Sequence, residues 1–274
     1  MKPPRIGVVG GAGQMGRWLR RFWEGRGLEA RYSDRGTPLS NEEIVGWADL
    51  TFVAVPLRDT PPVLRALSPL LEPRQALISI ASLMGPSADA LALGVGEAIC
   101  VHPVFGPTVR EYRDLPVVMA RIRGNRWGAW LAAELREAGL AVRESSPAEH
   151  DRAMAVVQAL LHSLYVGLCQ TMSAAGLGPV AALEWASPTM QLQLGLVARI
   201  LGQDPELYAD LVVGNAWSPA LLEDLADSLR KLASFARTGD REAFAEAFAQ
   251  ARESFGDRAA GLSERAEAAL ERFP

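Results

Sequence analysis

The chain has 274 residues, of which 49% are hydrophobic, and a formal net charge of −4 at pH 7. This length allows one large domain or two moderate ones, and the acidic balance excludes a general nucleic-acid binder, which needs a basic face. The two cysteines, Cys100 and Cys169, form no C-x-x-C pair, so we expect no metal or redox motif and a reducing compartment. Without a signal-peptide pattern or a long uninterrupted apolar run, the sequence predicts a cytoplasmic protein that does not contact a membrane.

Short apolar segments alternate with helical patterns through the first half of the chain. Strands that alternate with helices predict an α/β fold, a mostly parallel, doubly wound sheet covered on both faces. The predicted strands are residues 5–9, 28–33, 50–55, 76–80, 98–101 and 116–121.

A glycine cluster follows the first of these strands and opens a helix. The segment VVGGAGQMG contains Gly11-x-Gly13-x-x-Gly16, which in this β-α-β context is the Rossmann-type dinucleotide motif. Its glycines make the tight turn, let the pyrophosphate approach, and let helix and strand pack, while the helix N-terminus faces the phosphates. Asp34 ends the second strand, where an acid binds the adenine ribose and repels a 2′-phosphate, so NAD is favoured; Arg35 beside it keeps NADP open.

The cofactor would extend from this loop toward the end of the third strand. Val55 and Pro56 lie there, on the side expected for the nicotinamide, and either seat the ring or belong to the core. The predicted cofactor-binding residues are Gly11, Gly13, Gln14, Met15, Gly16, Asp34, Val55 and Pro56.

The pattern changes at Ser146, which is spaced as a capping box with Glu149. Helical patterns without a strand follow, so we expect a dinucleotide-binding domain over 1–146 and an all-α substrate and dimerisation domain over 147–274. The amphipathic stripes of the last helices either close an intramolecular bundle or complete their core against a second subunit. We favour the second arrangement, a homodimer.

Histidine is the candidate base for a nicotinamide enzyme, because the chain has two lysines and neither is well placed. His102 ends a strand at the carboxyl edge of the sheet, where ligands bind in open α/β folds; the alternative is a satisfied polar residue. His150, in a first helical turn beside charged residues, is interpreted as solvated. His162 lies in an apolar helical run, which is typical of a satisfied core histidine.

The segments HPVFGP, EHDRAMAVVQALLH and SPTMQLQLGLVARILGQDPELYADLV resemble the prephenate dehydrogenase family of tyrosine biosynthesis, in particular its enterobacterial type. The resemblance implies NAD-dependent oxidative decarboxylation of prephenate, a small dicarboxylate, to 4-hydroxyphenylpyruvate. Hydride leaves C4, a base takes the 4-hydroxyl proton, and the ring carboxylate leaves as CO2. The resemblance makes His102 the base and Ser82 a residue that binds the hydroxyl and orients the base. It makes His162 a second active-site histidine and Arg199 the ligand of a substrate carboxylate.

Two positions depart from the family pattern. Met84 stands where the enterobacterial members carry a lysine, and Gln191 where they carry an arginine; Gln191 shares a helix face with Arg199, and we expect it to contact substrate. The lost charges suit 4-amino-4-deoxyprephenate, which brings its own amine and leads to 4-aminophenylpyruvate in antibiotic pathways. Arogenate is a third substrate. A β-hydroxyacid dehydrogenase would need a lysine such as Lys231, and a dinucleotide-sensing module would need neither His102 nor Arg199.

Overall fold

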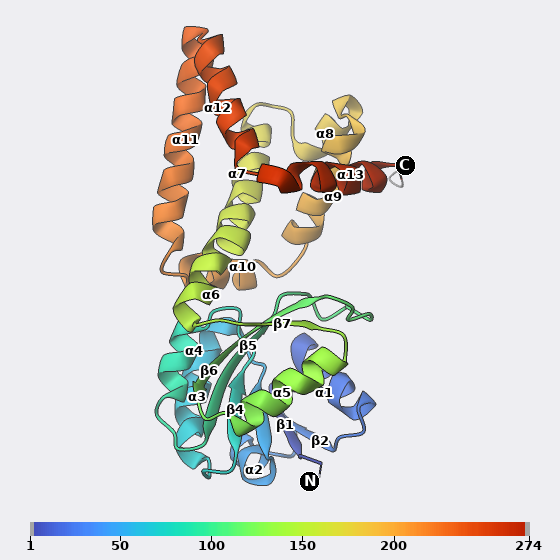
Figure 1. Cartoon of the computed structure of the whole chain (residues 1–274), viewed down its shortest axis with the longest axis vertical. Coiled ribbons are helices and arrows are strands. Elements are labelled where there is room, and N and C mark those ends of the chain that lie inside the picture. Colours follow the sequence, from blue (N-terminus) through green and yellow to red (C-terminus); the bar gives the residue numbers. More distant parts are fainter. Residues whose placement is uncertain (1–2, 272–274) are drawn as a thin grey trace. The chain divides into compact units, whose positions relative to one another are not determined.

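The computed structural model describes residues 3–271, which form two compact units (Figure 1). The first unit extends to Ala155 and includes the later segment Ala209–Ala216; the second comprises Val156–Tyr208 and the chain from Trp217 onward. The first unit is thus discontinuous in sequence. The functions assigned above to residues 1–146 and 147–274 stay predictions.

A seven-stranded sheet in the order β2-β1-β3-β4-β5-β6-β7 forms the centre of the first unit. Every neighbouring pair is parallel except β5 and β6, which are antiparallel. The predicted α/β, doubly wound Rossmann-type fold is therefore confirmed. The strands are β1 (Ile6–Val9), β2 (Ala30–Ser33), β3 (Leu50–Val53), β4 (Ala76–Ser79), β5 (Glu97–Pro103), β6 (Pro116–Arg123) and β7 (Ala141–Glu144).

Helices cover both faces of this sheet, and each face has its own hydrophobic cluster (Figure 1). Helices α1 and α5 pack on one face, and α2, α3 and α4 on the other. In α1 the side chains of Trp18, Leu19, Phe22 and Trp23 form a buried apolar stripe, which stabilises the unit by about 1.5–3 kcal/mol for each large side chain. The helices are α1 (Gln14–Gly25), α2 (Asn41–Trp47), α3 (Thr60–Leu67), α4 (Gly85–Leu91), α5 (Arg126–Glu137) and α6 (Pro147–Met154), with 3-10 turns η1 (Leu57–Asp59) and η2 (Ser68–Leu70).

The second unit is helical, as predicted. A π-helical segment, η3 (Ala155–Leu160), joins α6 to α7 and contains the boundary between the units. The remaining elements are α7 (Leu161–Ala174), α8 (Pro179–Ala182), η4 (Leu183–Trp185), α9 (Pro188–Leu201), α10 (Pro205–Val213), α11 (Ser218–Thr238), α12 (Arg241–Glu253), η5 (Gly256–Arg258) and α13 (Ala259–Leu270).

Large apolar side chains of the second unit lie open to solvent. Val180, Trp185 and Phe248 are 82%, 81% and 67% exposed, and no side chain of α7, which the structure describes in full, is buried. The helical stretch Pro147–Ala174 is long and apolar enough to cross a membrane by length and composition alone, a test that core helices of soluble proteins also pass.

Candidate active site

The glycine loop lies between β1 and α1, where close backbone packing excludes side chains. A Cβ atom on Gly16 would lie 2.2 Å from the Gly10 carbonyl oxygen, and one on Gly11 would lie 2.3 Å from Tyr32 Cβ. Helix α1 begins at Gln14, and its N-cap Gly13 supplies no capping side chain. The N–H groups of the first turn are therefore available to an anion, as dinucleotide binding requires.

A cleft of about 950 Å³ opens beside this loop. The Asp34 carboxylate lines it and accepts hydrogen bonds from the backbone N–H groups of Ala12 and Arg35, at 2.8 and 2.7 Å. Arg35 also lines the cleft. The lining includes Gly13, Asp34, Val55 and Pro56, whereas the turn and first helical turn contain Gly11, Gln14, Met15 and Gly16. The cleft has the size and the polar groups of a dinucleotide site.

At the carboxyl end of β5 the structure places His102 in a buried chain of polar groups. His102 is 4% exposed, and its Nδ1 lies 2.9 Å from Nε2 of His150. Nδ1 of His150 lies in turn 2.7 Å from Oδ1 of Asp151. Two residues of α6 are thus linked to the predicted base, one directly and one through the other.

The start of α6 explains why these two side chains point inward. Ser146 and Glu149 form the predicted capping box, and Pro147 takes the first helical turn. Glu149 remains exposed while His150 is 2% exposed, so the interpretation of His150 as a solvated residue is wrong. The charged neighbours of His150 predicted that it would be exposed to solvent, but only the face of the turn that carries Glu149 is exposed.

Asp151 is a carboxylate surrounded by N–H donors. Its Oδ1 and Oδ2 accept hydrogen bonds from the backbone N–H groups of Met84 and Gly85, both at 2.8 Å. Its own carbonyl accepts a hydrogen bond from Nδ2 of the buried Asn215 at 2.7 Å. Asp151 therefore connects α6 to the β4–α4 loop and to the discontinuous segment Ala209–Ala216.

Burial sets the charge state of His102. The pKa of His102 is lowered from 6.5 to about 3, chiefly by loss of solvent and also by the neighbouring His150, while Asp151 opposes both effects. His102 is therefore neutral near physiological pH, as a proton acceptor must be.

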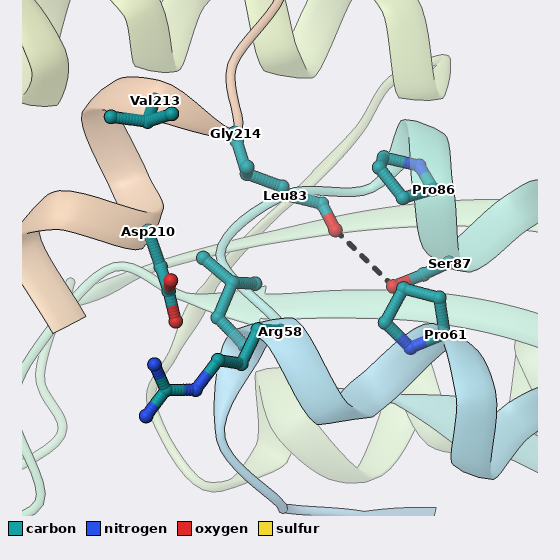
Figure 2. A pocket seen from close by; sticks show the side chains of 9 residues that line it. Arg58, Pro61, Leu83, Pro86, Ser87, Asp210, Val213 and Gly214 are labelled. Carbon is teal, nitrogen blue, oxygen red and sulfur yellow. Dashed lines mark hydrogen bonds between the residues drawn. The ribbon is translucent and has the colours of Figure 1, made fainter. Parts of the chain in front are cut away.

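The β4–α4 loop carries two residues singled out from the sequence. Ser82 is half-buried there, and its role stays a prediction. Met84 is 0% exposed and packs in the hydrophobic cluster beneath α4, so its side chain does not line an open surface. On another side of the loop, Leu83 accepts a hydrogen bond from Ser87 and, with Arg58 and Asp210, lines a largely apolar cavity of about 230 Å³ (Figure 2).

In the second unit, His162 of α7 and Arg199 of α9 both interact with Tyr208 of α10. The rings of His162 and Tyr208 meet edge to face with centroids 4.6 Å apart. Burial lowers the pKa of His162, and it raises the pKa of Tyr208 against the opposing charge of Arg199. Gln191 donates a hydrogen bond to the Ala186 carbonyl at 3.1 Å.

His162 is not the satisfied core histidine that its spacing predicted. Its Nδ1 is buried and has no hydrogen-bond partner among the described residues. The contact of Tyr208 with His162 was not predicted, because no spacing rule distinguishes Tyr208 within α10. Among residues 3–271, no group of three or more His, Cys, Asp or Glu side chains is placed to hold a metal ion.

The sheet topology, the glycine loop and the buried His102 at the carboxyl edge of the sheet are typical of one class of protein, the Rossmann-type oxidoreductases. The model of the prephenate dehydrogenase dimerization domain matches residues 146–250. The T-protein of Enterobacter agglomerans is 30% identical over 255 residues, which cover 92% of this chain and 68% of that protein. The chain belongs to the prephenate dehydrogenase family, as its sequence segments predicted, and is an enzyme of the prephenate dehydrogenase type.

Two further proteins are similar to this chain. The 4-amino-4-deoxyprephenate dehydrogenase of Streptomyces pristinaespiralis is 26% identical over 279 residues, covering 94% of this chain and 93% of that protein. The crystal structure of prephenate dehydrogenase from A. aeolicus, in complex with hydroxyphenyl propionate and NAD+, has a TM-score of 0.74 at 17% identity and covers 93% of this chain and 98% of that one. The second similarity concerns the fold.

Proposed function

We propose that this chain catalyses the NAD-dependent oxidative decarboxylation of a prephenate-type cyclohexadiene. The observation that carries the proposal is the buried, neutral His102 at the carboxyl edge of a dinucleotide-binding sheet, hydrogen-bonded at 2.9 Å to His150. This edge is where open α/β sheets bind ligands. A neutral imidazole there can take the proton that the 4-substituent loses as hydride leaves C4.

The residues around the glycine loop suit NAD. Gly16 leaves a backbone surface that a Cβ atom would block, and Asp34 lines the cleft with an acidic group that repels a 2′-phosphate. NAD, when bound, supplies the hydride acceptor, and the A. aeolicus relative was crystallised with NAD+. Arg35 leaves NADP as the alternative cofactor.

In the reaction with prephenate, Nε2 of His102 accepts the 4-hydroxyl proton, and Ser82 binds that hydroxyl. Loss of the ring carboxylate as CO2 makes the ring aromatic and yields 4-hydroxyphenylpyruvate. In the second unit, the Arg199 guanidinium binds a substrate carboxylate through two parallel hydrogen bonds. We assign His162 and Gln191 to the substrate site as well, because His162 keeps a buried ring nitrogen free of partners among the described residues.

Steady-state kinetics of the full chain test this proposal. His102→Asn should lower kcat by about 10²–10⁴-fold, the usual contribution of general base catalysis, while the Kd for NAD stays within about twofold. Formation of NADH with prephenate reports kcat, and calorimetry reports the Kd. Unaltered turnover in the variant would remove His102 from the mechanism and overturn the proposal.

4-Amino-4-deoxyprephenate is the second candidate substrate, and the S. pristinaespiralis relative, alike over nearly its whole length, favours it. Gln191 supports it too, because an amide stands where the family has an arginine. Met84 adds nothing, since it is buried in a hydrophobic cluster. A kcat/KM comparison on prephenate, the amino analogue and arogenate separates the candidates. A value for prephenate equal to or above that for the amino analogue contradicts the second candidate.

We also propose that the second unit forms a homodimer in the cytoplasm. A second copy would cover the exposed apolar side chains such as Trp185 and Phe248, and residues 146–250 match a dimerization domain. The helix that could span a membrane begins with the buried, hydrogen-bonded His150 and Asp151, which suits protein surroundings better than lipid. Sedimentation equilibrium should return twice the chain mass at micromolar concentration. A monomer there contradicts the proposal.

A further inference from the structure

We propose that Asp151 is a positioning residue that acts through His150 to make Nε2 the basic nitrogen of His102, and that the same carboxylate holds the loop carrying Ser82. The inference rests on the proposed function, because it takes His102 as the base. It assigns a role to two α6 residues that do not themselves contact the reacting atoms.

The positions of the protons follow from two backbone N–H groups that can only donate hydrogen bonds. The N–H groups of Met84 and Gly85 can only donate, so both oxygens of Asp151 must act as acceptors. Oδ1 of Asp151 therefore also accepts the hydrogen bond from Nδ1 of His150, which must carry a proton.

The same logic continues to the base. In the form of His150 that carries one proton, on Nδ1, the lone pair lies on Nε2, so this nitrogen accepts the hydrogen bond that joins it to His102. Nδ1 of His102 is then the donor, and its lone pair lies on Nε2. The opposite assignment would place a lone pair of His150 against the Asp151 carboxylate, which is repulsive.

The arrangement also stabilises the product of proton transfer. When His102 becomes an imidazolium, its Nδ1 proton is already directed at His150, and the charge of Asp151 lies one hydrogen bond further on. All three side chains are buried, at 4%, 2% and 9% exposure, so solvent does not screen this interaction. Asp151 thereby opposes the effect of burial on the pKa of His102.

The carboxylate has a second task in the β4–α4 loop. It binds both N–H groups that follow Leu83, and a Cβ atom on Gly85 would lie 3.0 Å from its Oδ2, which leaves little room for another residue. Asn215 fixes the Asp151 backbone from the other side. One side chain thus sets the protonation pattern of the base and the place of the loop that carries Ser82.

Asp151→Asn is the decisive variant, because an amide must turn its NH2 group toward one of the N–H donors. We expect kcat to fall about 10²–10⁴-fold, up to the loss of about 10⁴-fold that accompanies the wrong tautomer of a catalytic histidine, with the Kd for NAD within about twofold. In the native chain the ¹⁵N shifts of the His102 ring should report a lone pair on Nε2. In the variant they should report a mixture of the two tautomers. Glu149→Gln, an exposed carboxylate of the same helical turn, is the control and should keep kcat within about twofold.

His150→Phe separates the two tasks, since it removes the link and leaves the bonds from Asp151 to the loop intact. If Asp151 acts through His150, adding Asp151→Asn to this variant should change kcat far less than it does in the native chain. His150→Phe also carries the test should Asp151→Asn fail to fold. Retention of native kcat and of the His102 tautomer in the variant that folds overturns the inference.

The control His102→Asn distinguishes this failure from failure of the proposed function. An inactive His102→Asn beside an active Asp151→Asn or His150→Phe refutes the positioning role alone. Full activity in His102→Asn would refute both proposals.

Discussion

Acid should unfold this protein through His102. In the unfolded chain its pKa is near 6.5, whereas burial lowers it to about 3 in the folded state. Between these values the unfolded chain binds the additional proton, so the free energy of unfolding rises with pH through this window and is level above it. The stabilising contribution is present above pH 6.5 and is lost as the pH falls toward 3.

The size of the effect follows from the two pKa values. The difference of about 3.5 corresponds to about 5 kcal/mol when the window has been crossed completely, because one pKa unit is worth about 1.4 kcal/mol. At about pH 4.5 the loss relative to neutral pH is about 3 kcal/mol. This is a large share of the stability of a typical domain.

Urea unfolding of the native chain and of His102→Gln, followed by circular dichroism from about pH 7.5 to 4.5, measures this contribution. Glutamine is uncharged throughout, so the native chain should lose about 3 kcal/mol more than the variant over this range. Carboxylates that titrate in both proteins cancel in the comparison. Parallel curves for the two proteins would refute the burial argument for His102.

Two further changes test the packing around the site. Gly16→Ala would bring a Cβ atom 2.2 Å from the Gly10 carbonyl oxygen. We therefore expect the free energy of unfolding in urea to fall by about 1–3 kcal/mol and calorimetry to show at least tenfold weaker NAD binding. Gly25→Ala is the control, because nothing lies within 4 Å of its added atom, and it should change neither quantity. Met84→Lys places an ammonium in a site that is 0% exposed, so it should lower the free energy of unfolding by several kcal/mol without raising kcat/KM for prephenate. Met84→Leu is the control and should lower the free energy of unfolding by less than about 1.5 kcal/mol. A stable Met84→Lys with improved prephenate turnover would contradict the placement of this side chain.

The features that the sequence predicts well are local in the chain. The glycine loop, the acid at Asp34 and the capping box of Ser146 each depend on a few neighbouring residues with fixed spacing. The apolar stripe of α1 is also visible in sequence, because a helix buries every third or fourth residue. The edge strand β7, with the largely exposed sequence AVRE, lacks the apolar pattern of the inner strands and was not predicted.

The contacts of His102 with His150, and of His150 with Asp151, could not be predicted from local sequence patterns. His150 and Asp151 lie beside Glu149 and Arg152, a composition typical of a solvated turn. Asp151 contacts the β4–α4 loop and Asn215, which are 64–67 residues away along the chain, and His150 contacts His102, which is 48 residues away. No local pattern encodes such contacts, so the resemblance to a family singled out His102 as the predicted base but did not indicate which side chains surround it.

The discontinuity of the first unit has a consequence for the order in which the protein folds. Asn215, which caps the Asp151 carbonyl, lies 64 residues further along the chain, and Leu211 of the same segment is buried at 5% exposure. During synthesis the sheet and α6 emerge first, without these two partners. The first unit is therefore finished only after most of the α7–α10 region has left the ribosome, and a gene fragment ending at Ala155 would encode an unfinished unit.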